Sequence, residues 1–252
     1  FHVFNNKMKH CLAYILLLLL TACGADKHLK KGDQYYAIGE YYEASLEYAK
    51  AYSKTPSQKR DERGKIAYKV AESNRKLNYI SKALAAYRNA ARYKYTDTLT
   101  YFYIGELERA SRDYKSAAKN YQLYLETHPG DPATLLGLQS CAAAPVLREK
   151  GSQYTVREDR FFNARYDDFS PVLADDRIYF SSTRKESTGD DANGVTGMKS
   201  GDIFMAEKDE KGKWKRPVPV EGGVNTAYDE GACALSPDGK TMYFTRCRWD
   251  AR

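Results

Sequence analysis

The segment that decides the fold is residues 32–56, which read GDQYYAIGEYYEASLEYAKAYSKTP. Small and aromatic residues recur in it at fixed intervals, at Gly32, Tyr35, Gly39, Tyr41, Ala44, Tyr48, Ala51 and Pro56. Small residues let two helices cross closely, and aromatic side chains fill the spaces between neighbouring hairpins. The spacing therefore predicts a pair of antiparallel helices that ends near Pro56.

Two further copies of this pattern follow, at Ala71, Ala83, Tyr87 and Ala90, and at Gly105, Tyr114, Ala117, Tyr121 and Pro129. The central alanines Ala44, Ala83 and Ala117 lie 39 and then 34 residues apart, and we expect all three to be buried at helix crossings. The second interval is the period of tetratricopeptide repeats, which the three copies resemble. The first interval predicts about five extra residues in the loop around Ser57 to Arg63.

The resemblance implies a tetratricopeptide α-solenoid over residues 23–145. Asp131-Pro132 is expected to open a last, solvating helix from Ala133 to about Ala144, and Pro145 to end it. The first helices of the repeats would line a concave groove, a mixed apolar and charged surface that suits a peptide or a partner helix. Its candidate partner-facing residues are Tyr36, Tyr68, Arg75, Phe102 and Arg109, with Leu29, Asp33 and Glu106 beside them.

The pattern changes after Gly151 from helical spacing to alternation of apolar and polar residues, with Asp, Asn and Gly at the turns. We therefore expect a second, β-rich domain over residues 151–252. Two of its segments repeat one another with an offset of 62 residues, Tyr166-Asp167-Asp168 and Tyr228-Asp229-Glu230. These acidic elements are predicted to fix turns rather than to bind a ligand.

Residues 236–240, Ser-Pro-Asp-Gly-Lys, predict a hairpin turn, because proline presets φ and glycine accepts a positive φ. The strand after this turn contains Tyr243-Phe244, and Asp202-Ile203-Phe204 is expected to be the third strand of the preceding unit. Together these features resemble the repeat of TolB-like, WD-type β-propellers. The resemblance implies an incomplete propeller, since about two blades fit here whereas propellers have roughly 4 to 8.

The N-terminus carries a predicted export signal. Met8 is a candidate start, and the apolar run of nine residues from Leu12 to Leu20 is too short for a membrane span, which takes about 20. Leu20-Thr21-Ala22-Cys23 resembles the lipobox of bacterial lipoproteins, which implies cleavage before Cys23 and acylation of its thiol. Residues 1–22 are thus expected to be a signal peptide, of which 1–7 lie upstream of the start, and acyl chains on Cys23 to tether the protein to a membrane.

Charge and cysteine content exclude some functions. Only Lys7 and Lys9 of the 40 basic residues precede Cys23, so the chain after it has 38 basic and 33 acidic residues, an excess of +5. This excess is dispersed along the chain, which argues against nucleic-acid binding. Cys141, Cys233 and Cys247 form an odd set without CxxC spacing, which argues against zinc.

Catalytic and metal motifs are also missing from the sequence. Only His28 and His128 follow Cys23, so the β-rich half has no base for a Ser-His-Asp arrangement and no histidine ligands. Asp190, Asp191 and Asn193 lie in a glycine-bearing loop, but the acidic alternation of a calcium loop breaks there. We expect no catalytic residues, no metal and no cofactor.

A lipobox, tetratricopeptide repeats and a TolB-like propeller, in this order, resemble the Bacteroidetes envelope lipoproteins that continue into an OmpA-like peptidoglycan-binding domain. One member belongs to the type IX secretion machinery. The resemblance implies a non-catalytic scaffold, lipid-anchored at the periplasmic face of the outer membrane. Its implied partners are envelope, secretion or gliding proteins and, through a domain beyond Arg252, peptidoglycan.

Two alternatives stay open. The first is a general envelope-integrity or carbohydrate-uptake lipoprotein built from the same modules. The second is a propeller-gated serine peptidase whose catalytic domain follows Arg252. An OmpA-like ending would favour the scaffold, and a Gly-x-Ser-x-Gly elbow the peptidase.

The cysteines of the last predicted hairpin are not expected to pair with each other. Centring the turn on Asp238-Gly239 places Cys233 opposite a residue near Phe244, about three residues short of Cys247. At roughly 3.3 Å per residue this displacement exceeds the reach of a disulfide. We expect Cys247 to bond a cysteine shortly after Arg252, which also resembles what related propellers show.

Overall fold

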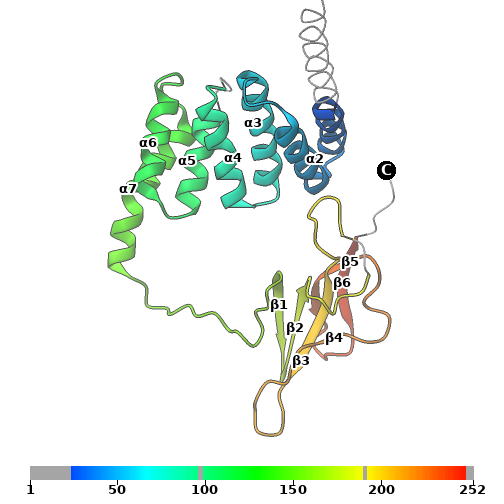
Figure 1. Cartoon of the computed structure of the whole chain (residues 1–252). Helices are drawn as coiled ribbons and strands as arrows, with labels where there is room; N and C mark the ends of the chain where they lie inside the picture. Colours follow the sequence, from blue (N-terminus) through cyan, green and yellow to red (C-terminus); the bar gives the residue numbers. More distant parts are fainter. Residues whose placement is uncertain (1–23, 96–98, 190–191, 248–252) are drawn as a thin grey trace, which may run out of the picture. The chain divides into compact units, whose positions relative to one another are not determined.

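The computed structural model describes residues 24–95, 99–189 and 192–247 (Figure 1). The lipobox, Cys23 and the pair Asp190-Asp191 therefore lie outside the described residues. The chain divides into two compact units, Phe1–Gln153 with Gly194–Thr196, and Tyr154–Asn193 with Gly197–Arg252. The first is helical and the second consists of strands and loops.

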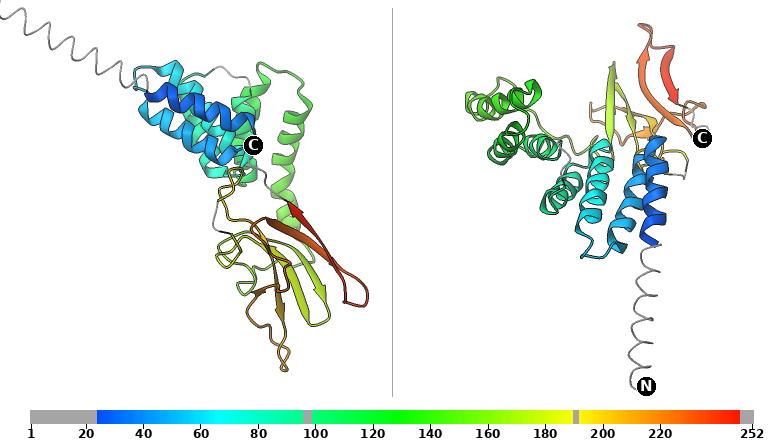
Figure 2. Two further views of the ribbon diagram at one scale, coloured as in Figure 1. Left: turned by 90° about the vertical axis from the view of Figure 1, so that its right-hand side faces the viewer. Right: turned by 90° about the horizontal axis from the view of Figure 1, so that it is seen from above.

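The helical unit is built from consecutive helices that lie side by side in chain order (Figures 1 and 2). A first helix, described over residues 24–37, is followed by α2 (Tyr41–Lys54), α3 (Arg60–Lys76), α4 (Ile80–Arg92), α5 (Thr100–Ala110), α6 (Tyr114–Leu125) and α7 (Pro132–Lys150). The first six form three hairpins, which confirms a helical, tetratricopeptide-like region.

Each hairpin turns at an equivalent residue with a positive φ. These residues are Gly39 (φ 83°), Asn78 (φ 57°) and Arg112 (φ 66°). In each turn the N–H of the following residue donates back to a carbonyl five residues earlier, at 2.9 to 3.0 Å. Such left-handed caps satisfy the last carbonyls of a helix, and only glycine adopts them without strain.

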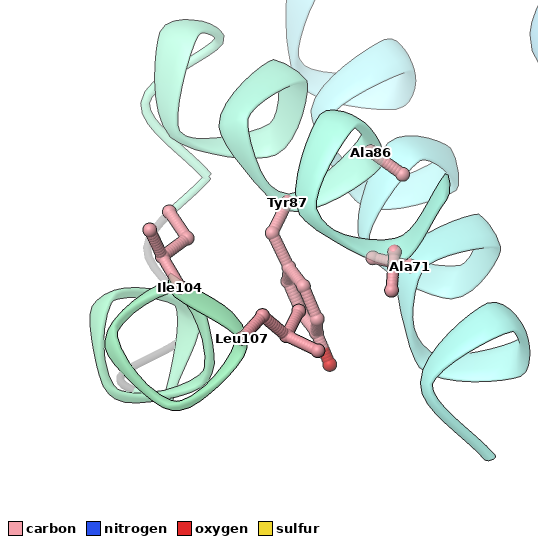
Figure 3. Close-up of a cluster of buried hydrophobic side chains, with 6 residues drawn as sticks. Ala71, Ala86, Tyr87, Ile104 and Leu107 are labelled. Carbon is pink, nitrogen blue, oxygen red and sulfur yellow. The ribbon is translucent and has the colours of Figure 1, made fainter. Parts of the chain in front are cut away.

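The core of the unit lies where the hairpins cross. Ala44, Ala83 and Ala117 have no exposed surface, which confirms their predicted burial. A Cβ at Gly32 would come within 2.6 Å of the Tyr48 ring, so glycine there lets the ring lie directly against the first helix. Figure 3 shows the cluster between the second and third hairpins, in which the buried residues are Ala71, Ala83, Ala86, Tyr87, Ile104 and Leu107.

Two predictions about helix bounds were wrong. The extra residues near Ser57 to Arg63 are not all loop, because α3 begins at Arg60 and is 17 residues long, whereas α5 has 11. Pro145 does not end the last helix, which continues to Lys150. Pro145 removes one N–H, which costs a helix about 3 kcal/mol, but the positive φ of Gly151 supplies the actual stop.

The strand unit contains two open antiparallel sheets. The larger has the order β1 (Asp168–Ala174), β2 (Arg177–Ser182), β3 (Asp202–Glu207) and β4 (Val218–Pro219), and the smaller pairs β5 (Asp229–Leu235) with β6 (Met242–Cys247). The predicted third strand at Asp202 is thus confirmed. A closed propeller is not part of the described fold and stays a prediction.

The register of the last hairpin agrees with the prediction. Ser236 donates its N–H to the Thr241 carbonyl at 2.8 Å and Gly239 has a φ of 67°, so residues 236–240 form the turn. Cys247 lies opposite Asp229, and Cys233 lies in the bulge between Gly231 and Ala234. Among the described cysteines Cys233 is buried, Cys247 is exposed, and neither forms a disulfide. A bond from Cys247 to a later cysteine stays a prediction.

Candidate partner-binding groove

The first helices of the three hairpins carry three rows of equivalent side chains. One row is apolar, one acidic, and one is formed by a tyrosine and two arginines. In chain order the rows are Leu29, Tyr68 and Phe102; Asp33, Glu72 and Glu106; and Tyr36, Arg75 and Arg109. The rows are equivalent because each acid accepts a hydrogen bond from a tyrosine 15 residues later: Tyr48, Tyr87 and Tyr121.

The second and third hairpins contain the same three-residue network. Arg75 donates to Glu72 Oε2 at 2.8 Å and to the Tyr87 hydroxyl at 3.1 Å, while that hydroxyl donates to Glu72. In the third hairpin Arg109 donates to Glu106 Oε2 at 2.8 Å and to the Tyr121 hydroxyl at 3.1 Å, while that hydroxyl donates to Glu106. Each arginine is therefore neutralised and held in one orientation by its own hairpin. The first hairpin has Tyr36 at the arginine position.

Side chains also join each hairpin to the next. Lys69 of α3 donates to Asp33 Oδ1 at 2.6 Å, and the Arg75 guanidinium lies 4.0 Å from the centre of the Tyr103 ring on α5. Ion pairs and cation–π contacts of this kind fix the spacing of neighbouring helices. The groove is thus a preformed surface within this unit.

The pKa values of the groove reflect these contacts. Burial, reinforced by the hydrogen bond that its hydroxyl donates to Asp33, raises the pKa of Tyr48, and burial together with the hydrogen bond to Glu72 does the same for Tyr87. Burial acts to raise the pKa of Asp33, but hydrogen bonds from Lys69 and Tyr48 outweigh it and leave that pKa below its usual range. The tyrosines therefore stay protonated and act as donors at neutral pH.

The predicted groove residues all lie on the first helices of the three hairpins, and they differ in how far they are buried. Tyr36, Tyr68, Arg75, Phe102, Arg109, Leu29 and Glu106 are half-buried, and Asp33 is exposed. Tyr68 also packs edge-on against Tyr87, with ring centres 5.6 Å apart, so part of its surface belongs to the core. Sequence reasoning missed Glu72, although its spacing of 34 residues from Glu106 was a usable signal.

A cavity of about 460 Å³ opens beside Leu29. It lies between the first helix and α3, and the segment before α3 closes one side of it. Its lining is both apolar and charged: Ala25, Asp26, Leu29, Thr55, Pro56, Lys59, Glu62, Lys65 and Ile66. Volumes of this size accommodate small ligands or several side chains of a peptide.

The repeated acidic elements of the strand unit have a different role. Asp168 accepts the Ala164 N–H at 2.7 Å and pairs with Arg184 at 2.5 Å. In the second copy Glu230 accepts the Thr226 N–H at 2.9 Å and pairs with Arg246 at 2.6 Å. The arginines also donate to the Phe162 and Val224 carbonyls. Both copies thus brace the loop before a strand, as predicted for turn-fixing elements.

Metal-ligand groups and membrane-spanning helices are both missing from the described residues. Among those that the structure describes, no three His, Cys, Asp or Glu side chains are grouped as a metal would require. No helix in the described ranges is long and apolar enough to cross a membrane.

Comparison with known proteins gives only structural similarities. No family model and no curated protein matches the chain. The first tetratricopeptide domain of Spaghetti (RPAP3), solved bound to an HSP90 peptide, is 22% identical over 49% of this chain and 94% of that one, with a TM-score of 0.43. For MamA the identity is 17%, the coverages are 55% and 78%, and the TM-score is 0.44.

The tetratricopeptide domain of Sgt2 from Aspergillus fumigatus is 19% identical over 54% of this chain and 87% of that one, with a TM-score of 0.41. Similarities at this level carry no weight for function. The tetratricopeptide-like fold stands on the helix pairs, the period and the shared tyrosine contacts described above.

Proposed function

We propose that this chain is a non-catalytic scaffold that binds a segment of a partner protein in the groove of its helical unit. The observation that carries the proposal is the repeated network of Arg75 with Glu72 and Tyr87, and of Arg109 with Glu106 and Tyr121. These networks hold polar side chains in fixed orientations beside half-buried aromatic rings. Preorganised surfaces of this kind bind peptides with a small entropy cost.

A photocrosslinking amino acid at Tyr36 tests the groove in the living cell. We expect a discrete adduct with one partner, and we expect Arg109→Ala to weaken it because the substitution dismantles one network. The matched control places the same amino acid at Leu123 on α6, a second helix of a hairpin, where the side chain is 41% exposed. Adducts of equal yield and identity at both positions would contradict groove binding.

The finer proposal is that the scaffold is a lipoprotein at the periplasmic face of the outer membrane. It rests on the lipobox-like Leu20 to Cys23 and on the order of modules. Cys23→Ala should release the protein from membrane fractions, whereas Cys11→Ala, a cysteine substitution within the signal, should leave it there. Membrane retention of Cys23→Ala after normal signal cleavage would contradict the anchor.

We further propose that the partners belong to a secretion, gliding or other envelope machine that the scaffold links to peptidoglycan. This part rests on the family resemblance alone. Sequencing the gene past the codon for Arg252 tests it. An OmpA-like domain supports the link to the cell wall, and a Gly-x-Ser-x-Gly elbow supports a peptidase instead.

A further inference from the structure

The second helices of the hairpins form a surface that the proposed groove does not use. Between α2 and α4, with α3 as its floor, lies a crevice of about 390 Å³. Small and apolar side chains line most of it, among them Leu46, Ala49, Ala67, Val70, Ala85 and Ala86. Leu46 is 38% exposed at its mouth, so the crevice is open to solvent.

The next interface along the array shows what normally fills this space. The residues equivalent to Ala49, Asn74 and Ala86 are Arg88, Glu108 and Asn120, by the same offsets that align the hairpins. Arg88 and Asn120 each donate to the buried carboxylate of Glu108 at 2.8 Å. At the second interface a charged network thus occupies these three positions.

The first interface holds none of these groups. Ala49 and Ala86 stand at the positions of Arg88 and Asn120, and Asn74 stands at the position of Glu108. Asn74 donates its side-chain N–H to the Val70 carbonyl of its own helix at 2.7 Å. The two interfaces therefore differ at these three equivalent positions, where small or neutral side chains replace the charged network.

The charge around the crevice indicates its occupant. Lys82 lies in its lining, and α4 carries no acidic residue. The charge of Arg88 on the same helix is paired with Glu108, so Lys82 is the basic group that the crevice itself presents. An apolar recess beside a basic helix is complementary to an amphipathic helix with acidic flanks, in which apolar side chains at i and i+4 enter the recess. A basic or uncharged segment would lack the electrostatic part of this match.

We propose that the crevice between α2, α3 and α4 is a second binding site, which takes the apolar side chains of an acidic amphipathic helix from a partner protein. This site is separate from the groove, so the chain would bind two partners or bind one partner at two sites. The volume falls in the range of about 300–1,000 Å³ typical of binding pockets.

The test uses the mature full chain and a fluorescein-labelled helical peptide that carries leucines at i and i+4 and glutamates elsewhere. We expect a saturable rise in fluorescence anisotropy. A peptide with the two leucines changed to asparagine, and one with the glutamates changed to lysine, should each bind at least tenfold more weakly. No binding of the Leu/Glu peptide up to millimolar concentration would overturn the proposal.

Two variants close the crevice by different routes. Ala49→Arg with Asn74→Glu transplants the charged pair of the neighbouring interface without changing net charge, and Ala85→Phe fills the exposed mouth. Either change should weaken binding at least tenfold, while Ala142→Phe, at an exposed alanine of α7, should not. Circular dichroism at 222 nm verifies the fold of each variant, and Ala85→Phe serves if the double variant fails to fold.

Unchanged peptide affinity in both closing variants would overturn the proposal. An equal loss of affinity in Ala142→Phe would also overturn it. So would equal binding of the leucine and asparagine peptides. Arg109→Ala separates the two sites, because it disturbs the groove and should leave peptide binding at the crevice unchanged.

Discussion

The two units of this chain use the same chemical pair, an arginine with a carboxylate, in different ways. In the helical unit Arg75–Glu72 and Arg109–Glu106 are i,i+3 pairs on a helix surface, with arginine side chains 25% and 37% exposed. In the strand unit Arg184–Asp168 and Arg246–Glu230 join residues 16 apart, and the carboxylates are 7% and 0% exposed. Both units repeat such a pair, but only in the strand unit are both carboxylates buried.

The difference shows how burial decides what an ion pair does. Removal of one partner from a buried pair leaves an uncompensated charge and costs about 3–5 kcal/mol, whereas an exposed pair contributes about 0–1 kcal/mol. The pairs of the strand unit therefore stabilise loops. Of the groove pairs, Arg109–Glu106 is about one-third exposed on both sides, so it should contribute little to stability and remain accessible to a partner.

The largest effect is expected at Arg184. Arg184→Met should destabilise the strand unit by about 3–5 kcal/mol, because it leaves the buried Asp168 carboxylate without its positive partner and removes the donor to the Phe162 carbonyl. Both tryptophans lie in the β-rich half of the sequence, so urea unfolding followed by tryptophan fluorescence reports this unit. Arg160→Met, at a 90% exposed side chain, is the matched control. Equal losses in both variants would show that burial of the carboxylate does not set the cost of losing its arginine.

Glu47 tests whether a buried carboxylate behaves in the same way within the helical unit. Burial acts to raise its pKa, but hydrogen bonds from His28 and Lys50 outweigh this and lower the pKa to about 2. The pair thus contributes stability above the unfolded-state pKa near 4.5, and this contribution is lost as the pH falls from about 4.5 to about 2. The loss should amount to about 3 kcal/mol.

Unfolding followed by circular dichroism at 222 nm across pH 2 to 7 measures the effect of Glu47. Glu47→Gln should lower stability at neutral pH and flatten the profile below about pH 4.5, since the titrating group is gone. An unchanged profile would mean that other carboxylates control the acid sensitivity of the helices.

A packing change at a helix crossing should have an intermediate effect. Ala117 has no exposed surface, so Ala117→Leu overpacks the crossing and should cost about 1–3 kcal/mol. Thermal unfolding at 222 nm should show a lower melting temperature than for Ala143→Leu, at an exposed position of α7. Equal melting temperatures would show that the crossing tolerates a larger side chain.

The smallest effect on stability is expected in the groove. Glu106→Gln keeps the size of the side chain and removes its charge from a pair that is about one-third exposed on both sides, so the cost should be below about 1 kcal/mol. Crosslinking from Tyr36 should nevertheless weaken, because Arg109 loses its charged partner. A stability loss as large as that of Arg184→Met would remove the distinction between the two kinds of pair.

Much of the fold could be predicted because it depends on local patterns. The alanine positions and the turn at 236–240 follow from spacing, since helix crossings require small residues at fixed intervals and tight turns require a positive φ. The strand register that separates Cys233 from Cys247 follows from the same turn. The groove residues were assigned to the correct helices for the same reason, although their role in binding stays a prediction.

The errors concern helix bounds, where one local signal did not decide the end of a helix. Pro145 is a helix breaker by its chemistry, but one lost hydrogen bond did not end α7. The 39-residue interval before Ala83 gives the length of the insertion but not its conformation, so its prediction as a loop was wrong. In the structure most of it extends α3, which packs against both α2 and α4.

Neighbours along the chain suffice to specify the helical hairpins, their period, the change to strands after Gly151 and the residues of one hairpin turn. Which polar side chains meet depends on the three-dimensional packing. Glu72 with Tyr87, Arg184 with Asp168, and Arg88 with Glu108 are 15, 16 and 20 residues apart. The crevice at the first interface between hairpins likewise depends on the side chains of three helices at once.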